Sequence, residues 1–90
     1  MFRNVLMHYD KLLPLRAVSS TCVQGVGYDE NEWVLQLKFV GDGPRYNYFR
    51  VPPHEHAALL NAPSLGEYVN RQIRRYYECE EAGVTEASAG

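Results

Sequence analysis

The chain has 90 residues, of which 46% are hydrophobic and 22% are charged, and its formal net charge is −2 at pH 7. This length fits one small domain with a single core and excludes a multidomain enzyme. No run of residues approaches the roughly 20 apolar residues of a membrane span, and the first residues develop no signal-peptide core, which predicts a cytoplasmic protein without a membrane partner. Cys22 and Cys79 have neither metal-ligand spacing nor the density of a disulfide scaffold, so we expect two free thiols.

Charge is distributed unevenly along the chain. Residues 15–77 carry seven basic and six acidic side chains, so bulk charge does not indicate a strongly cationic nucleic-acid-binding protein. Residues 78–90 contain four glutamates and no lysine or arginine. Such a composition buries too little apolar surface to offset the entropy of ordering, and we expect residues 78–90 to form a disordered acidic tail.

The first 17 residues are predicted to form an arm outside the domain. An apolar stripe typical of a short helix is formed by Val5, Leu6, Tyr9, Leu12 and Leu13. Because the segment is short and Pro14 follows it, an extended arm is equally compatible with the pattern.

Two strand patterns follow the arm. Residues 22–28 are rich in valine and glycine and are typical of a strand, which ends at the polar turn of residues 29–32. Residues 33–40 alternate strictly and are predicted to direct four large apolar side chains to the core, namely Trp33, Leu35, Leu37 and Phe39.

A Gly-Asp-Gly-Pro turn returns the chain as a second hairpin arm in residues 45–51. A loop with an even number of residues places Tyr46 and Tyr48 opposite Phe39 and Leu37, respectively, so that both tyrosines face the core. A loop with an odd number of residues, or a bulge, turns both side chains to the other face of the sheet.

Two short helices are predicted after the hairpin. Pro53 suits the first turn of a helix that runs to about Asn61. Ser64 and Glu67 match a capping box, in which the serine hydroxyl accepts a hydrogen bond from the backbone N–H of Glu67. The second helix then buries a stripe formed by Leu65, Val69, Ile73 and Tyr76. The predicted fold class is α+β, with an antiparallel meander of about three strands packed against two short C-terminal helices.

Several short motifs follow one another in a fixed order between residues 18 and 77. They are Val18-Ser19-Ser20, Gly27-Tyr28-Asp29, Leu35-x-Leu37-x-Phe39, Tyr46-x-Tyr48, Val51-Pro52 and Ala62-Pro63-Ser64-x-Gly66-x-Tyr68-x-Asn70-x-x-Ile73-Arg74. Together they resemble the KTSC domain, which is named for the C-terminal region of some lysyl-tRNA synthetases and also occurs as stand-alone small bacterial and phage proteins. The resemblance implies a central Tyr-x-Tyr motif and an unassigned activity, for which RNA binding is suggested by the synthetase context.

Two tyrosines and a cationic helix face are the candidate nucleic-acid-binding residues. The rings of Tyr46 and Tyr48 offer faces on which unpaired bases stack, although cross-strand packing is an alternative role for both. Phosphate-binding donors are predicted on the helix face that carries Asn70, Arg71, Arg74 and Arg75. A solvated face with ion pairs, for example between Arg74 and Glu67, is the alternative.

The remaining candidates are weaker. Ser64 and Gly66 lie at a predicted helix N-terminus, which favours an anion, but capping accounts for Ser64 and close packing for Gly66. His54 and His56 are two residues apart on a predicted helix and therefore do not match the i, i+4 spacing of a helical zinc pair. No nucleophile elbow or nucleophile beside a positioned base is recognisable, so we expect no catalytic residue, no bound metal and no cofactor.

These patterns favour a non-catalytic module that binds nucleic acid, most simply RNA, through the tyrosines and arginines. About three phosphate contacts would give a salt slope of roughly −2 on a single strand and weak affinity. The alternative is a protein-interaction adaptor or a small homodimeric accessory protein that uses the apolar arm of residues 5–13 or a sheet edge. We also expect the acidic tail to compete with nucleic acid for the arginines.

Overall fold

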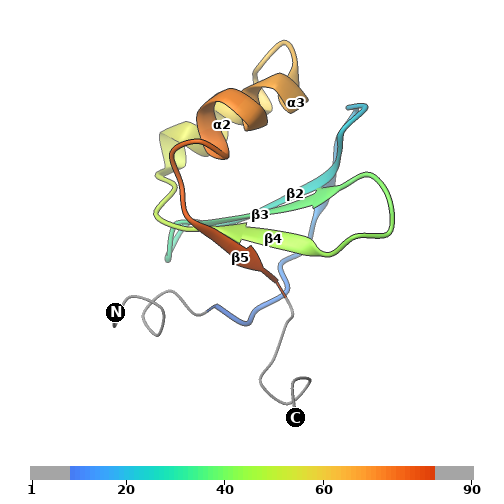
Figure 1. Cartoon of the computed structure of the whole chain (residues 1–90). Coiled ribbons are helices and arrows are strands. Elements are labelled where there is room, and N and C mark those ends of the chain that lie inside the picture. Colours follow the sequence, from blue (N-terminus) through green and yellow to red (C-terminus); the bar gives the residue numbers. More distant parts are fainter. Residues whose placement is uncertain (1–8, 83–90) are drawn as a thin grey trace.

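A five-stranded antiparallel sheet carries two helices on one of its faces (Figure 1). The computed structural model describes residues 9–82. The elements in chain order are β1 (Arg16–Ala17), β2 (Val23–Asp29), β3 (Val34–Phe39), β4 (Arg45–Tyr48), α2 (Pro53–Leu60), α3 (Leu65–Tyr68), the π-helical turn η1 (Val69–Ile73) and β5 (Cys79–Glu81). The strands lie in the order β1-β2-β3-β4-β5, so the α+β class and the meander are confirmed, with a short strand added at each edge.

The main hydrophobic core lies between the sheet and the helices. Alternation along β3 sends Leu35 and Leu37 to this face, and both are fully buried. The core cluster consists of Val23, Val26, Leu35, Leu37, Tyr48, Val51, Leu59, Val69 and Ile73. Full burial of one such aliphatic side chain stabilises the fold by about 1.5 to 3 kcal/mol, so this cluster holds the helices on the sheet.

The β3–β4 hairpin decides between the two faces that the sequence left open: both tyrosines lie on the core face, as the even-loop alternative predicts, but in a different register. Leu37 pairs with Tyr46 and Leu35 pairs with Tyr48, which shifts the predicted register by two residues. The shift is even, so each side chain keeps its face. The last pair of the ladder is Lys38 with Arg45, and the Lys38 ammonium donates to the backbone carbonyl of Gly41 inside the loop at 2.7 Å.

Trp33 is not part of the core face, which corrects the sequence prediction. β3 begins at Val34, and Trp33 precedes it with a φ of 59° and a 44% exposed side chain. The preceding turn is held by the Asp29 carboxylate, which accepts hydrogen bonds from the backbone N–H groups of Asn31 and Glu32. This turn brings Trp33 into the left-handed region, so the alternation of β3 starts one residue later than the sequence pattern indicates.

The two helices begin where predicted, but the second changes its pitch. The Ser64 hydroxyl accepts a hydrogen bond from the Glu67 N–H at 3.3 Å, so the predicted cap is confirmed. In η1 the Arg74 N–H donates to the Val69 carbonyl, a π-type bond that adds one residue to the turn. The extra residue shifts the helix phase, so Tyr77 packs against the core and Tyr76 is 69% exposed, contrary to the predicted stripe. Within residues 9–82 no helix has the length and apolarity needed to cross a membrane.

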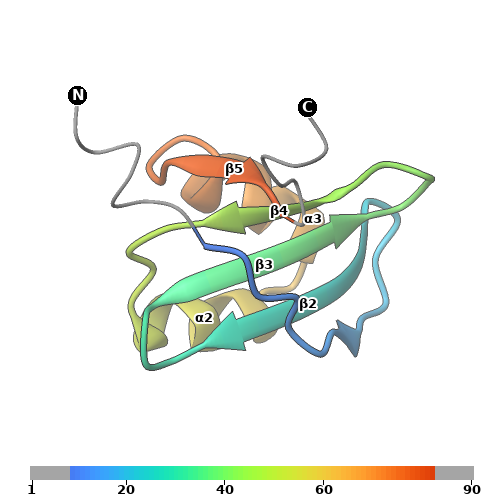
Figure 2. The same cartoon turned by 90° about the horizontal axis from the view of Figure 1, so that it is seen from below.

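The described part of the arm is extended and not helical. Figure 2, viewed from the face opposite the helices, shows the segment before β1 crossing the sheet over β3 and β2. Two glycines of β2 make this crossing possible: a Cβ atom at Gly27 would lie 3.0 Å from the Pro14 carbonyl oxygen, and one at Gly25 would lie 3.1 Å from the Leu15 Cβ. The helix alternative is thus wrong for residues 9–13, while residues 5–8 lie outside the described part of the chain.

The beginning of the acidic segment is ordered, contrary to prediction. β5 pairs with β4, and the Ala82 N–H donates to the Arg45 carbonyl at 2.8 Å. The backbone edge of β4 supplies hydrogen-bond partners that composition alone does not reveal. The rest of the predicted tail, residues 83–90, lies outside the described residues.

Candidate functional site

A groove opens at the end of the sheet where the β3–β4 loop approaches the residue that follows η1. Its volume is about 520 Å³, and it is lined by Phe39, Val40, Gly43, Pro44, Tyr46, Tyr48, Arg74 and Cys79. We call it the β4 groove. Alternation along β4 aims both tyrosines at its floor, the C-terminal end of η1 supplies Arg74, and the pairing of β5 with β4 brings Cys79 opposite Tyr48.

The aromatic wall of the β4 groove is built by Tyr46 and Phe39. Their ring centroids are 6.0 Å apart and the ring planes are inclined by 59°. Tyr46 is only partly buried and keeps part of its ring open to the groove. Tyr46 thus packs against the core cluster and Phe39 and also lines the groove.

Tyr48 does not share that geometry, because its side chain is only 3% exposed and belongs to the hydrophobic core. Burial is the main cause that raises the pKa of Tyr48 to about 12, and the neighbouring Cys79 adds to it. The phenol is thus protonated at neutral pH. It offers the groove a hydroxyl rather than a free ring face, which corrects its expected role in stacking.

The predicted cationic cluster is divided by the structure. Arg74 lines the β4 groove, and its Nη1 donates to the Asn70 side-chain oxygen at 3.2 Å, so these two residues act together. Arg71 lies 3.6 Å from the Glu67 carboxylate and lines a separate cavity with Ser64. Arg75 is exposed and lines neither cavity. The groove therefore holds one of the three predicted arginines.

The proposed anion site at Ser64 and Gly66 is accounted for by local structure. Ser64 is engaged as the helix cap. A Cβ atom at Gly66 would lie 3.3 Å from both the Cβ and the Sγ of Cys22, so the glycine permits close approach of the segment before β2. Packing and capping thus explain both residues without a bound anion.

Two clusters of titratable groups lie beside α2 and were missed by the sequence analysis. The Tyr68 hydroxyl donates to the Glu55 carboxylate at 2.5 Å, a bond that raises the pKa of Tyr68 to about 12 and links α3 to α2. His56 stacks on Tyr28 with ring centroids 4.3 Å apart, and burial lowers the pKa of His56. No sequence spacing connects these partners, because their contacts form between separate elements. Among residues 9–82 no group of three or more His, Cys, Asp or Glu side chains is placed to hold a metal ion.

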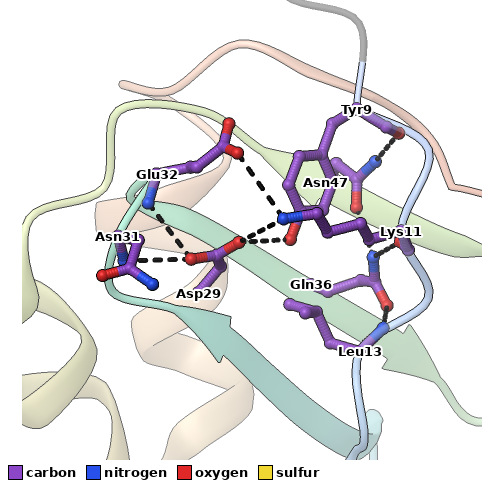
Figure 3. A network of polar contacts seen from close by, with 8 residues as sticks. All are labelled: Tyr9, Lys11, Leu13, Asp29, Asn31, Glu32, Gln36 and Asn47. Carbon is purple, nitrogen blue, oxygen red and sulfur yellow. Dashed lines mark hydrogen bonds and ion pairs between the residues drawn. The ribbon is translucent and has the colours of Figure 1, made fainter.

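A third missed cluster lies on the opposite face of the sheet, under the arm (Figure 3). Gln36 and Asn47 are both fully buried, and the Gln36 amide donates to the Asn47 side-chain oxygen at 2.7 Å. Both amides also bond to the backbone of the arm. The signal in the sequence is an amide at each outward position in the middle of the hairpin, which by itself is also typical of a solvated face.

Comparison with known proteins gives one family and several relatives. The sequence model of the KTSC domain matches residues 19–77. A protein from Tsukamurella paurometabola is 41% identical over 60 residues, which cover 67% of this chain and 88% of the relative. An uncharacterised protein from Stutzerimonas stutzeri is 38% identical over 58 residues, covering 64% of this chain and 80% of that protein.

A longer protein carries a similar segment. A lysine–tRNA ligase from Nostoc punctiforme is 31% identical over 68 residues, which cover 76% of this chain but only 12% of the ligase. Among solved structures, the crystal structure of a KTSC domain protein from Yersinia pestis matches with a TM-score of 0.72 and 27% identity. That match covers 78% of this chain and 97% of the other.

Proposed function

Because the chain belongs to the KTSC domain family, we propose that it is a non-catalytic RNA-binding module that holds an unpaired nucleotide in the β4 groove. The observation that carries this proposal is the meeting of a partly open aromatic ring, Tyr46, with one guanidinium, Arg74, in a groove of about 520 Å³. A base and its phosphate require this pair of contacts. The lysine–tRNA ligase relative supports RNA as the ligand, since its name places a similar segment in a protein that acts on tRNA.

Each side chain has a distinct task in the proposed complex. Tyr46 stacks on the base, which contributes about 1 to 3 kcal/mol. Arg74 binds the phosphate, and Asn70 holds the guanidinium in place through their 3.2 Å hydrogen bond. Tyr48 forms part of the groove lining, where its hydroxyl is engaged by the Cys79 side chain.

The composition of the groove supports binding without catalysis. Among its described lining residues there is no imidazole or carboxylate to serve as a general base. Tyr48 does not fill that role, because its raised pKa keeps it protonated at neutral pH.

The geometry lowers the strength of binding that the sequence predicts. A single phosphate contact through Arg74 gives a salt slope of about −0.7 on a single strand, compared with roughly −2 for three arginines. Affinity is then expected at or beyond the weak end of the non-specific range, about 10⁻⁴ M at physiological salt.

An NMR titration of the labelled chain with a short single-stranded RNA tests this proposal. We expect shifts at the β4 groove that fall with salt and are lost in Arg74→Ala and Tyr46→Leu. Matched controls are Arg71→Ala, in the neighbouring cavity, and Tyr76→Leu, an exposed ring outside the groove. The proposal is wrong when RNA causes no shifts at millimolar concentration, or when the controls weaken binding as much as the groove variants.

A protein-interaction role is the second candidate, and it is favoured by the outward side of the arm. Leu12 is 60% exposed there, although Tyr9 and Leu13 of the same segment pack on the sheet. Sedimentation velocity of the full chain and of its Leu12→Asp variant separates the cases. If the full chain is a dimer and the variant is a monomer, Leu12 lies in an interface. If both chains are monomers, no such interface exists.

A further inference from the structure

The face of the sheet opposite the helices, which we call the outer face, is covered by one extended segment. Residues 9–15 cross it with alternating side chains: Tyr9 is buried, Leu13 packs against the small cluster of Val34 and Phe49, and Leu12 between them is 60% exposed. Alternation of this kind is what an extended peptide shows when it lies on a surface. The segment is thus extended on the sheet, with Tyr9, Leu13 and Leu15 directed to it. The Lys11 side chain is 60% exposed and reaches the carboxylates of the turn after β2.

The outer face binds the backbone of this segment through side chains. Asn47 Nδ2 donates to the Tyr9 carbonyl at 3.1 Å. Gln36 bonds to the peptide groups on both sides of Leu12. Its Nε2 donates to the Lys11 carbonyl at 3.0 Å, and its Oε1 accepts from the Leu13 N–H at 3.0 Å. Arg45 Nη1 donates to the Leu13 carbonyl at 2.6 Å. The Glu80 carboxylate accepts a hydrogen bond from the Tyr9 N–H at 3.2 Å. These five contacts hold the backbone of a peptide in this conformation, whatever its side chains.

Side-chain selectivity comes from the two ends of the segment. The Tyr9 hydroxyl donates to the Asp29 carboxylate at 2.7 Å, and the Lys11 ammonium lies 3.8 Å from Asp29 and 3.6 Å from Glu32 (Figure 3). At the other end Gly25 and Gly27 leave room for leucine side chains, since a Cβ atom on either would lie 3.1 Å from Leu15. The face therefore fits a tyrosine, a basic residue two positions later, and leucines four and six positions later.

We propose that the outer face is a docking surface for an extended peptide, and that residues 9–15 of a second copy of this chain can replace the chain's own segment. The surface and its occupant are separate parts of the chain. The side chains of Gln36, Arg45 and Asn47 lie within the family match of residues 19–77, Glu80 on β5 lies just after it, and the segment lies before it. Only the two-residue strand β1 and a short loop join them. A second copy supplies the same groups, so exchange preserves every contact.

The chain's own segment competes against the segment of a second copy, and its covalent link gives it an effective concentration in the millimolar range. Occupation by a second copy therefore requires high protein concentration or a weakened segment. The surface is separate from the β4 groove, so its occupation is expected to leave RNA binding unchanged.

A full chain with Tyr9→Gly and Leu13→Gly tests the proposal. We expect a synthetic peptide of residues 9–16 to displace the weakened segment and bind in its place. Binding would be seen as NMR shifts of the Gln36 and Asn47 side-chain amides. The peptide carries its own controls: Leu13→Asp within it should weaken binding about tenfold or more, whereas Leu12→Asp should not, because the Leu12 side chain faces away from the sheet. A folded variant that does not bind, or equal binding of both substituted peptides, overturns the proposal.

Hydrogen exchange of the unaltered chain decides the case even when the variant fails to fold. Docking by exchange requires the segment to detach while the sheet stays intact. We expect the Leu13 N–H, which bonds to Gln36, to exchange at least about tenfold faster than the N–H groups in the centre of β3. Equal rates would mean that the segment leaves only when the whole domain unfolds, and the proposal would then be wrong.

Discussion

Replacing Gly27 by alanine is the sharpest test of how the arm is seated. A Cβ atom there would lie 3.0 Å from the Pro14 carbonyl oxygen, 3.1 Å from the Leu13 Cβ and 3.1 Å from a Leu15 methyl group. The nearest of these atoms belongs to the backbone, so the clash is not relieved by a change of rotamer. Either the arm lifts and loses its contacts, or β2 moves against a packed core.

Overpacking of this kind costs about 1 to 3 kcal/mol. For a domain of this size, 2 kcal/mol corresponds to a urea midpoint lower by on the order of 2 M, at a slope near 1 kcal/mol/M. The matched control is Gly43→Ala, because a Cβ atom at Gly43 meets nothing within 4 Å. We expect that control to remain within about 0.5 kcal/mol of the parent chain.

Urea unfolding followed by fluorescence of the single tryptophan measures both variants. Hydrogen exchange at the Leu13 N–H shows which of the two segments moves. If the arm lifts, this N–H exchanges faster than the other amides of the sheet. If β2 moves, amides of the sheet exchange faster as well. Equal stability of Gly27→Ala and Gly43→Ala would refute the packing of the arm against β2.

Three further outcomes are expected from the same fold. Gln36→Leu removes the partner of the Leu13 N–H inside a buried network and should cost roughly 2 to 4 kcal/mol in urea unfolding, whereas an effect below about 0.5 kcal/mol would contradict the network. The Tyr9 hydrogen bond lowers the pKa of Asp29 in the folded chain, so the stability it contributes is present above the unfolded pKa of about 3.9 and is lost as the pH falls through the folded value. Asp29→Asn should accordingly flatten the acid limb of a stability–pH curve, and an unchanged limb would assign acid sensitivity to other groups. A chain that ends at Ala82 keeps β5, whereas deletion of residues 78–90 removes it and should lower the free energy of unfolding by more than about 1 kcal/mol; equal stability of the two in thermal unfolding would show that β5 contributes nothing.

The β5 strand also changes the experiment that tests competition by acidic residues. Glu81 lies opposite Tyr46 across the β4–β5 pair, and Cys79 of the same strand lines the β4 groove. Deleting all of residues 78–90 would therefore alter the groove itself. Truncation after Ala82 retains the wall but removes only Glu86 of the four glutamates, so tighter RNA binding by that chain would support competition by Glu86.

Local chemistry in the sequence was sufficient for most of the individual elements. Proline at the start of α2 and the serine cap of α3 act over a few residues, so their effects can be read directly from the chain. Alternation in β3 and β4 has a period of two, so the sequence indicated that Tyr46 and Tyr48 share one face of the sheet. It left open which face, because that depends on the length of the loop.

The candidate site was predictable only in part. The sequence indicated Tyr46 and Arg74, and the structure brings both to one groove. It did not indicate that Tyr48 is buried, because burial depends on the helices that cover the sheet. Nor did it indicate that Arg71 is directed to another cavity, since the π-type turn in η1 changes the helix phase between the arginines.

The sequence by itself therefore determined the three central strands, the start of each helix and the serine cap of the second helix. Only the tertiary structure decided the extended arm, the fifth strand and the two buried amides beneath the arm. The physical reason is the range of the interactions. Gln36 bonds to Leu13 across 23 residues and Asn47 bonds to Tyr9 across 38, and the value of such contacts depends on a sheet that has already brought the partners together.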